Sequence, residues 1–200
     1  MKRMKQTLVL LGLLLGLLPL AAQTPQRLEG PARDGAVAKV LEANDIRTSL
    51  QFRFVMTRNS ALLNEALVSS GHAAYVYPDK LRWEVESPRR SVFVLNGDNV
   101  TDRRQQALLR NVSKIGGKGL INDSDFAVTV YQTPAQWQID MVPLRRDLGQ
   151  LFSLITLLAD PATGVLRSVV LTETGGDVTS LELKSIVKGR PLDGGLFVQP

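Results

Sequence analysis

The chain has 200 residues, with 24 lysines and arginines against 19 aspartates and glutamates, a single histidine and no cysteine. This composition excludes disulfide frameworks, thiol nucleophiles, zinc fingers, iron–sulfur clusters and histidine-rich metal sites. Lys2, Arg3 and Lys5 lie at the very start, so the rest of the chain carries 21 basic and 19 acidic side chains. That small excess gives no support for a nucleic-acid-binding protein.

Residues 1–22 have the pattern of an export signal. A basic start is followed by an apolar run from Leu8 to Leu18, and residues 19–23 supply the small side chains that a signal peptidase requires. As a helix this run is roughly 16 Å long, about half the hydrocarbon thickness of a bilayer. We therefore expect a cleaved signal and an exported, soluble protein. Because no cysteine follows the run, we expect no lipid anchor.

A leader and a helix are predicted next. Residues 23–33 are mostly polar and contain two prolines, which indicates a loose leader. Between Asp34 and Ile46 three apolar residues recur at helical spacing: Val37, Val40 and Leu41. Asp34 is a suitable N-cap for this helix.

Alternation of apolar and polar residues then predicts strands. It runs from Leu50 to Met56 and again from Leu81 to Glu86, as in strands with one buried face. The apolar segment 91–95 is followed by Asn96-Gly97, a strong hairpin signal, and then by residues 99–102. In Gly71-His72-Ala73, the histidine is placed at the start of a further strand.

A second helix and five more strands complete the predicted elements. The helix runs from Gln105 to Ile115, ends at Gly116-Gly117 and has an apolar face that includes Leu108, Leu109 and Val112. The strands form a hairpin around Thr133-Pro134 and a three-stranded meander; their ranges are 126–131, 136–141, 150–159, 165–174 and 178–187.

These elements predict one mainly β (α+β) domain over residues 34–200. About nine or ten strands suggest a large antiparallel sheet that curves strongly, with the helices covering its concave face. The pattern leaves open whether the interior is a packed core or a hydrophobic cavity.

Motifs for catalysis or metal binding are weak throughout. Any Ser-His-Asp triad would have to use His72, which we interpret as a surface or rim histidine. Residues 116–119 lack the other elements of a phosphate loop, and residues 122–125 lack the glycine and distal glutamate of a calcium loop. The arginine pairs at 89–90, 103–104 and 145–146 indicate solvated loops or docking points for acidic partners or lipid headgroups. We expect no enzymatic activity, cofactor or metal.

Two stretches carry the motifs of a known family. In the first, a strand led by Gly71 reaches Tyr75-Val-Tyr-Pro78 and Leu81-Arg82-Trp83, then Pro88 and the apolar strand that ends at Asn96-Gly97. The second runs from Leu151 through Asp160-Pro-Ala-Thr-Gly164 to Leu171. In order and spacing, over residues 34–198, these stretches resemble the LolA family, the periplasmic carriers of outer-membrane lipoproteins in Gram-negative bacteria.

The resemblance implies an unclosed β-barrel with a helical lid and a hydrophobic cavity for acyl chains. It implies a periplasmic chaperone that carries lipoproteins from the inner to the outer membrane. An inner-membrane lipoprotein-releasing transporter and an outer-membrane acceptor would be its partners, and we expect a monomer. One alternative is a periplasmic lipid-sensing or protein-interaction module of the same fold that acts through a partner protein. Another is a hydrolase that uses His72.

The resemblance also suggests site residues. The candidates for lining the cavity are Leu50, Phe52, Phe54, Trp83, Val85, Phe93 and Leu95. The candidates for the lid or covering helices are Val37, Val40, Leu41, Leu108, Leu109 and Val112. The same residues could instead fill an ordinary core. In family members an arginine that latches the lid precedes the proline matching Pro78; here Tyr77 takes that place, with Lys80 and Arg82 nearby.

Overall fold

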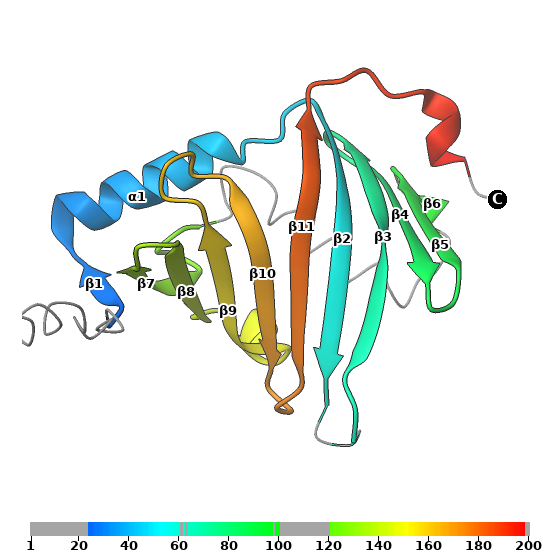
Figure 1. Ribbon diagram of the computed structural model, residues 1–200. Helices are drawn as coiled ribbons and strands as arrows, with labels where there is room; N and C mark the ends of the chain where they lie inside the picture. Colours follow the sequence, from blue (N-terminus) through cyan, green and yellow to red (C-terminus); the bar gives the residue numbers. More distant parts are fainter. Residues whose placement is uncertain (1–23, 61, 63, 98, 101–120, 199–200) are drawn as a thin grey trace, which may run out of the picture.

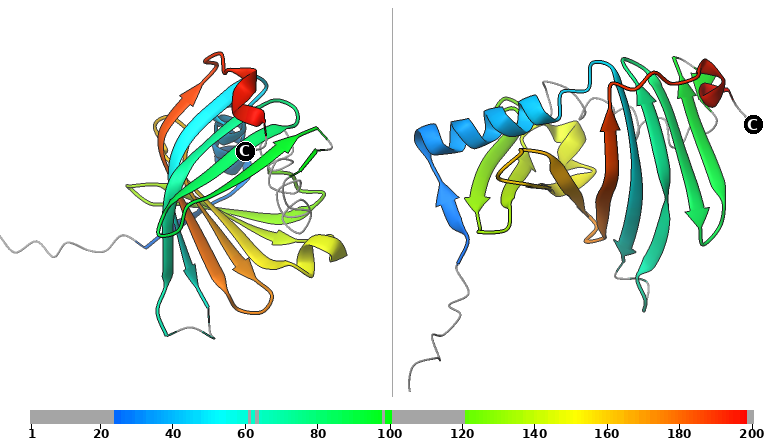
Figure 2. Two further views of the ribbon diagram at one scale, coloured as in Figure 1. Left: turned by 90° about the vertical axis from the view of Figure 1, so that its right-hand side faces the viewer. Right: turned by 45° about the horizontal axis from the view of Figure 1, so that its top comes forward.

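The computed structural model describes residues 24–60, 62, 64–97, 99–100 and 121–198. These residues form one antiparallel sheet of eleven strands in the order β1-β7-β8-β9-β10-β11-β2-β3-β4-β5-β6. The sheet curves strongly (Figures 1 and 2), and in the described residues its edge strands β1 and β6 do not pair with each other. The predicted fold class, a curved and unclosed antiparallel sheet, is confirmed.

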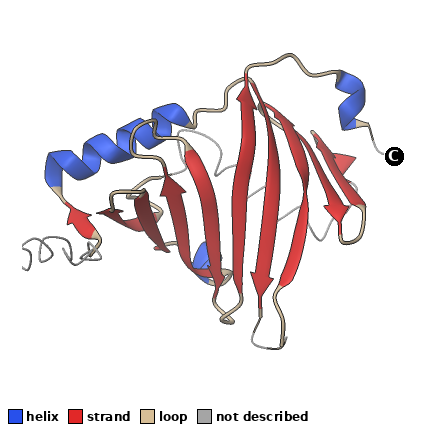
Figure 3. Ribbon diagram, in the orientation of Figure 1, coloured by secondary structure: helices blue, strands red, loops and turns tan. Residues whose placement is uncertain are grey.

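Helices are few beside the strands (Figure 3). The strands are β1 (Gln26–Leu28), β2 (Ser49–Asn59), β3 (Leu67–Val76), β4 (Lys80–Ser87), β5 (Ser91–Asn96), β6 (Asn99–Val100), β7 (Phe126–Gln132), β8 (Trp137–Pro143), β9 (Phe152–Ala159), β10 (Leu166–Glu173) and β11 (Val178–Lys188). The helical segments are α1 (Gly30–Ala43), α3 (Arg146–Gly149) and the 3-10 turn η1 (Gly194–Phe197).

Two meanders, β2 to β6 and β7 to β11, make up most of the sheet, and the pairing of β11 with β2 joins them. The predicted final meander agrees with β9, β10 and β11 to within about two residues at each end, the usual uncertainty of such boundaries. His72 lies in the middle of β3 and not at its start, because β3 is extended by pairing with β2 as far back as Leu67.

The N-terminal segment differs from the expected loose leader. Residues Gln26–Leu28 form β1, which pairs antiparallel with β7, and α1 begins at Gly30. Glu29 and not Asp34 is the N-cap, and Pro31 lies in the first turn, where its missing N–H leaves no hydrogen bond unmade. The edge of β7 supplies the partner that orders this short segment, which local composition does not indicate.

The helix α1 packs on the concave face of the β7–β10 half of the sheet (Figure 2). Val40 of α1 is fully buried in a core with Val130, Ile139 and Leu157 of three neighbouring strands. Within the described residues, no helix is both long and apolar enough to cross a membrane.

The C-terminal end of α1 is fixed to the turn between β9 and β10. The Asn44 side-chain amide donates to the carbonyl oxygens of Val40 and Gly164, at 2.7 and 2.9 Å, and its oxygen accepts from the backbone N–H of Leu166. Gly164 has a φ of +74°, and a Cβ there would lie 2.7 Å from the Lys39 carbonyl oxygen. A glycine is therefore required for this close approach.

Candidate functional site

The seven predicted cavity residues all lie on the concave face of the sheet. In an antiparallel sheet, directly opposed residues point to the same face. One row of opposed residues crosses from Phe52 through Ala73 and Trp83 to Phe93. The rows on either side contain the other four: Leu50 and Leu95 in one, Phe54 and Val85 in the other. Pairing through β11, β10 and β9 continues this face to the core beneath α1.

Burial divides the concave face into three zones. Beneath α1, residues such as Ile139 and Leu157 are fully buried. At the β3–β5 end, a small cluster of Tyr75, Leu81, Phe93 and Leu95 is also buried. Between them, eight apolar side chains are only half buried: Phe52, Met56, Trp83, Val85, Val169, Leu171, Leu181 and Leu183. We call these eight residues the central stripe.

Aromatic rings form the β2–β4 part of this surface. The ring of Trp83 stacks on that of Phe54 with a centroid distance of 4.1 Å, and Phe52 meets Trp83 edge-on at 6.0 Å. Between them runs β3, where a Cβ at position 71 would overlap the Glu84 carbonyl oxygen and lie 3.0 Å from Phe54. Gly71 therefore leaves the space across which the two rings meet.

The predicted lid residues of the first helix lie on α1. Val40 is in the core, while Val37 and Leu41 are half buried against it. Asn44 and Gly164 connect the end of this helix to the β9–β10 turn, and α1 covers β7 to β10. The predicted second helix with Leu108, Leu109 and Val112, the arginine pair at 103–104 and the glycines at 116–119 lie outside the described residues, as does the predicted signal at 1–22.

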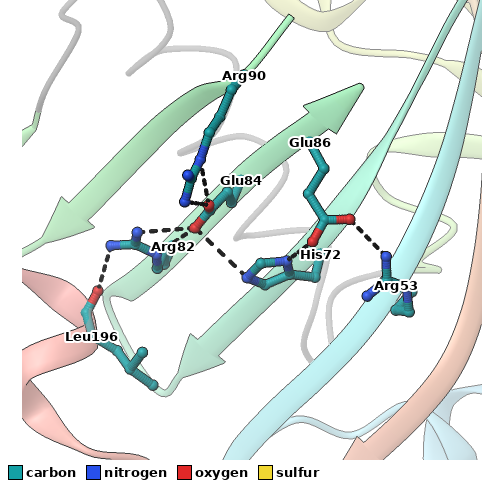
Figure 4. A network of polar contacts seen from close by, with 7 residues as sticks. All are labelled: Arg53, His72, Arg82, Glu84, Glu86, Arg90 and Leu196. Carbon is teal, nitrogen blue, oxygen red and sulfur yellow. Dashed lines mark hydrogen bonds and ion pairs between the residues drawn. The ribbon is translucent and has the colours of Figure 1, made fainter. Parts of the chain in front are cut away.

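Charged residues gather on the opposite, convex face (Figure 4). Glu84 is only 5% exposed and accepts hydrogen bonds from Arg90 at 2.7 Å and Arg82 at 2.9 Å. These two hydrogen bonds lower the pKa of the Glu84 carboxyl below its ordinary value, and the bond from Arg90 has the largest effect. His72 donates to Glu86 at 3.0 Å, and its other ring nitrogen is 3.7 Å from Glu84. The single histidine thus belongs to a convex-face ion-pair network.

Tyr77, which takes the place of the family's latch arginine, and Arg82 nearby have other contacts. Tyr77 is 55% exposed, and its backbone N–H donates to the Thr48 carbonyl. Arg82 lies on the convex face, where it donates to the Leu196 carbonyl of the C-terminal segment as well as to Glu84. Arg82 therefore binds the C-terminal segment and does not reach the concave face.

Sequence reasoning missed the stripe residues on β10 and β11. Val169, Leu171, Leu181 and Leu183 alternate along predicted strands, so the period-two signal was present. Their place beside Phe54 and Met56 depends on the pairing of β11 with β2, which are separated by more than a hundred residues in the chain.

Comparison with known proteins agrees with this geometry. Residues 47–199 match the sequence profile of the family described as outer membrane lipoprotein carrier protein LolA. The chain belongs to the LolA family. No match is found among curated protein sequences.

Several solved structures align with this LolA-family chain. MucB aligns with a TM-score of 0.53 and 14% identity over 84% of this chain and 62% of the MucB chain, and thus shares the fold. A LolA superfamily protein from Nitrosomonas europaea aligns at 0.44 and 9% identity, over 83% of this chain and 97% of that one. The complex of MucA and MucB from Pseudomonas aeruginosa aligns at 0.46 and 14% identity, over 82% of this chain and 60% of that one. This chain thus spans less than two thirds of MucB.

Proposed function

We propose that this protein is a periplasmic carrier that binds the acyl chains of lipoproteins on its central stripe and takes them from the inner to the outer membrane. The observation that carries the proposal is the stripe itself. It is a concave surface of half-buried hydrocarbon side chains on both sides of the buried Phe54 ring, flanked by a filled core on each side. Membership of the LolA family supports the same role.

The energetics of the cargo fit such a surface. A lipoprotein with three acyl chains exposes on the order of 40 methylenes, each unfavourable in water by ~0.8 kcal/mol. A carrier must cover much of this hydrocarbon and still release it to a membrane. Non-covalent affinities reach at most roughly 20 kcal/mol, so partial coverage on an open face is compatible with release.

We propose binding and not catalysis at this site. The stripe consists of aliphatic, aromatic and thioether side chains, none of which is a nucleophile or a general base. The single histidine of the chain is held by Glu86 and Glu84 on the other face of the sheet. A hydrolase that used His72 would have to place its substrate away from the hydrocarbon surface.

The route of the cargo follows from the chain's own features together with its family. The predicted signal at 1–22 would bring the protein to the periplasm of a Gram-negative bacterium. There an inner-membrane releasing transporter would supply acylated lipoproteins, and an outer-membrane acceptor would receive them. Purification from the native host after crosslinking should yield acylated proteins bound to this chain; their absence would contradict the carrier role.

Two adjacent residues of β11 provide a direct test of the binding surface. Leu181 lies in the central stripe, and Ser180 points to the convex face, while both are half buried. We expect Leu181→Glu to abolish binding of an N-palmitoyl peptide, because a carboxylate would meet hydrocarbon. Ser180→Glu should leave binding unchanged. Equal binding by the two folded variants would place the acyl site elsewhere.

A second candidate is a sensing or protein-interaction module of the same fold. MucB, which shares the fold, has been solved in complex with MucA. This alternative predicts a stable complex between our chain and a partner protein, and normal lipoprotein sorting when the chain is depleted. The carrier proposal predicts mislocalised lipoproteins on depletion, so lipoprotein fractionation separates the two.

A further inference from the structure

The concave face changes from apolar to polar at one end. Along β2, the stripe residue Met56 is followed on the same face by Arg58, and Thr179 of β11 is the directly opposed residue of Arg58. Opposite Met56 on β3 stands Ser69. This end lies toward the β2–β3 and β10–β11 hairpins (Figure 1). We call Arg58, Ser69 and Thr179 the polar end of the stripe.

Ser69 is the unusual member of this group. Its hydroxyl oxygen is buried and has no hydrogen-bond partner among the described residues. A buried hydroxyl without a partner is unfavourable, and native proteins rarely keep one. The neighbouring side chain on the same face is that of Met56, which offers only a weak sulfur acceptor. Rotation of the serine side chain about χ1 would turn this hydroxyl toward the stripe, where a hydrogen-bonding group on a bound molecule would satisfy it.

The charges at the polar end indicate which group that would be. The Arg58 guanidinium lies 2.9 Å from the Asp177 carboxylate and 3.3 Å from that of Glu173. With two acidic partners, Arg58 offers no excess positive charge to a phosphate or a free carboxylate. The polar end is therefore suited to a neutral acceptor, and a serine hydroxyl is a suitable donor to a carbonyl oxygen.

We propose that Ser69 donates a hydrogen bond to the ester or amide carbonyl at the head of a bound acyl chain. The hydrocarbon then lies along the stripe past Trp83 toward Leu50. The seven residues from Met56 to Leu50 span roughly 20 Å of strand, which an extended palmitoyl chain would follow. This inference rests on the proposed function, to which it adds the orientation of the cargo and a residue that recognises its linkage.

Two matched detergents test the carbonyl directly. Sucrose monolaurate and dodecyl maltoside share a disaccharide head and a twelve-carbon chain, but only the former has an ester carbonyl. Binding below the micelle concentration would be followed by Trp83 fluorescence in a Trp137→Phe background. We expect Ser69→Ala to weaken binding of the ester about fivefold, as for one lost hydrogen bond, and to leave binding of the glycoside unchanged.

Ser70→Ala is the control, because Ser70 is adjacent but points to the convex face. Ser69→Ala should also unfold at the same or a higher temperature than the wild type, since it removes an unpaired buried hydroxyl. If Ser69→Ala binds the ester as the wild type does, or loses both detergents equally, the inference is wrong. If the wild-type protein binds neither detergent, the proposed function itself fails.

The source of the carbonyl is tested with an N-palmitoyl peptide and a diacylglycerol as competitors. Tighter, Ser69-dependent binding of the peptide would assign the site to acylated proteins. Tighter, Ser69-dependent binding of the diacylglycerol would assign it to lipids. Competition that is insensitive to Ser69→Ala with both competitors would overturn the inference.

Discussion

The rings of Phe54 and Trp83 stack across an intervening strand, with their centroids 4.1 Å apart and their planes inclined by 25°. The two residues belong to β2 and β4, and β3 passes between these strands with Gly71 opposite Phe54. Offset stacking of this kind adds about 0.5–1.5 kcal/mol to the burial of the rings. The pair therefore helps to set the shape of the surface on which we propose that acyl chains bind.

Replacement of Gly71 should disrupt this arrangement. In Gly71→Ala the new Cβ would overlap the Glu84 carbonyl oxygen of β4 and press on Phe54. We expect a loss of about 2–3 kcal/mol in the free energy of unfolding, measured by urea denaturation, and a reduced near-UV signal from Trp83. Gly175→Ala, in an open turn with nothing within 4 Å, is the control. A wild-type stability for Gly71→Ala would show that β3 and β4 move apart easily.

Trp83 itself should be essential for acyl binding. Trp83→Glu places a carboxylate in the central stripe, and we expect the affinity for an N-palmitoyl peptide, measured calorimetrically, to fall at least about tenfold. Trp83→Phe keeps an apolar ring and should bind within about threefold of the wild type. Unchanged binding by a folded Trp83→Glu protein would remove this residue from the site.

Asn44 should be a major source of stability for α1. Asn44→Ala removes the hydrogen bonds to Val40, Gly164 and Leu166, and it leaves buried backbone groups without partners. We expect a loss of about 2–4 kcal/mol in the free energy of unfolding. Asn59→Ala, at the exposed end of β2, should change it by less than about 0.5 kcal/mol.

The same variant tests whether the cargo passes α1. If α1 is not on the route of the cargo, Asn44→Ala should leave the rate of acyl-chain release unchanged at temperatures where the protein stays folded. A marked acceleration of release, followed by stopped-flow fluorescence, would show instead that the acyl chain enters and leaves past α1.

The Glu84 network should make stability depend on pH. Hydrogen bonds from Arg90 and Arg82 lower the pKa of Glu84 in the folded protein below its ordinary value of 4.5. The unfolded chain therefore takes up the proton first as the pH falls, so this stabilisation is full above pH 4.5 and is lost through the lower folded pKa. Glu84→Gln should thus be less stable than the wild type by about 1–3 kcal/mol at pH 7, and the difference should vanish in acid.

A convex-face glutamate of β11 provides the comparison for this pH effect. Glu182 is exposed and forms an ion pair with Lys184. Glu182→Gln should change the free energy of unfolding by less than about 0.5 kcal/mol, because an exposed ion pair contributes little. A Glu84→Gln protein with the same stability difference at pH 7 and in acid would contradict the network's role.

The sequence by itself determined most of the strands and which of their residues share a face, but not β1 or the first half of β3. Alternation with a period of two is a local property, so it identified β2, β4 and the final meander and grouped Phe52 with Trp83 and Phe93. The motifs around Gly71 and Asp160 indicated the LolA family, and the match of residues 47–199 to the sequence profile of that family confirms it. Each of these two motifs contains a glycine that no other residue can replace without a clash: Gly71 lies opposite Phe54, and Gly164 lies beneath α1.

Only the tertiary structure decided what each face does. Whether an apolar side chain fills a core or stays half exposed depends on what packs above it, and α1 covers Ile139 but not Leu181. The pairing of β11 with β2 brought distant residues into one stripe. The same folding placed His72 in a convex ion-pair network and left the Ser69 hydroxyl without a partner at the polar end. Contacts between residues so far apart in the chain leave no periodic signal in the sequence, because they arise only when distant strands pair and the sheet curves to form a concave face.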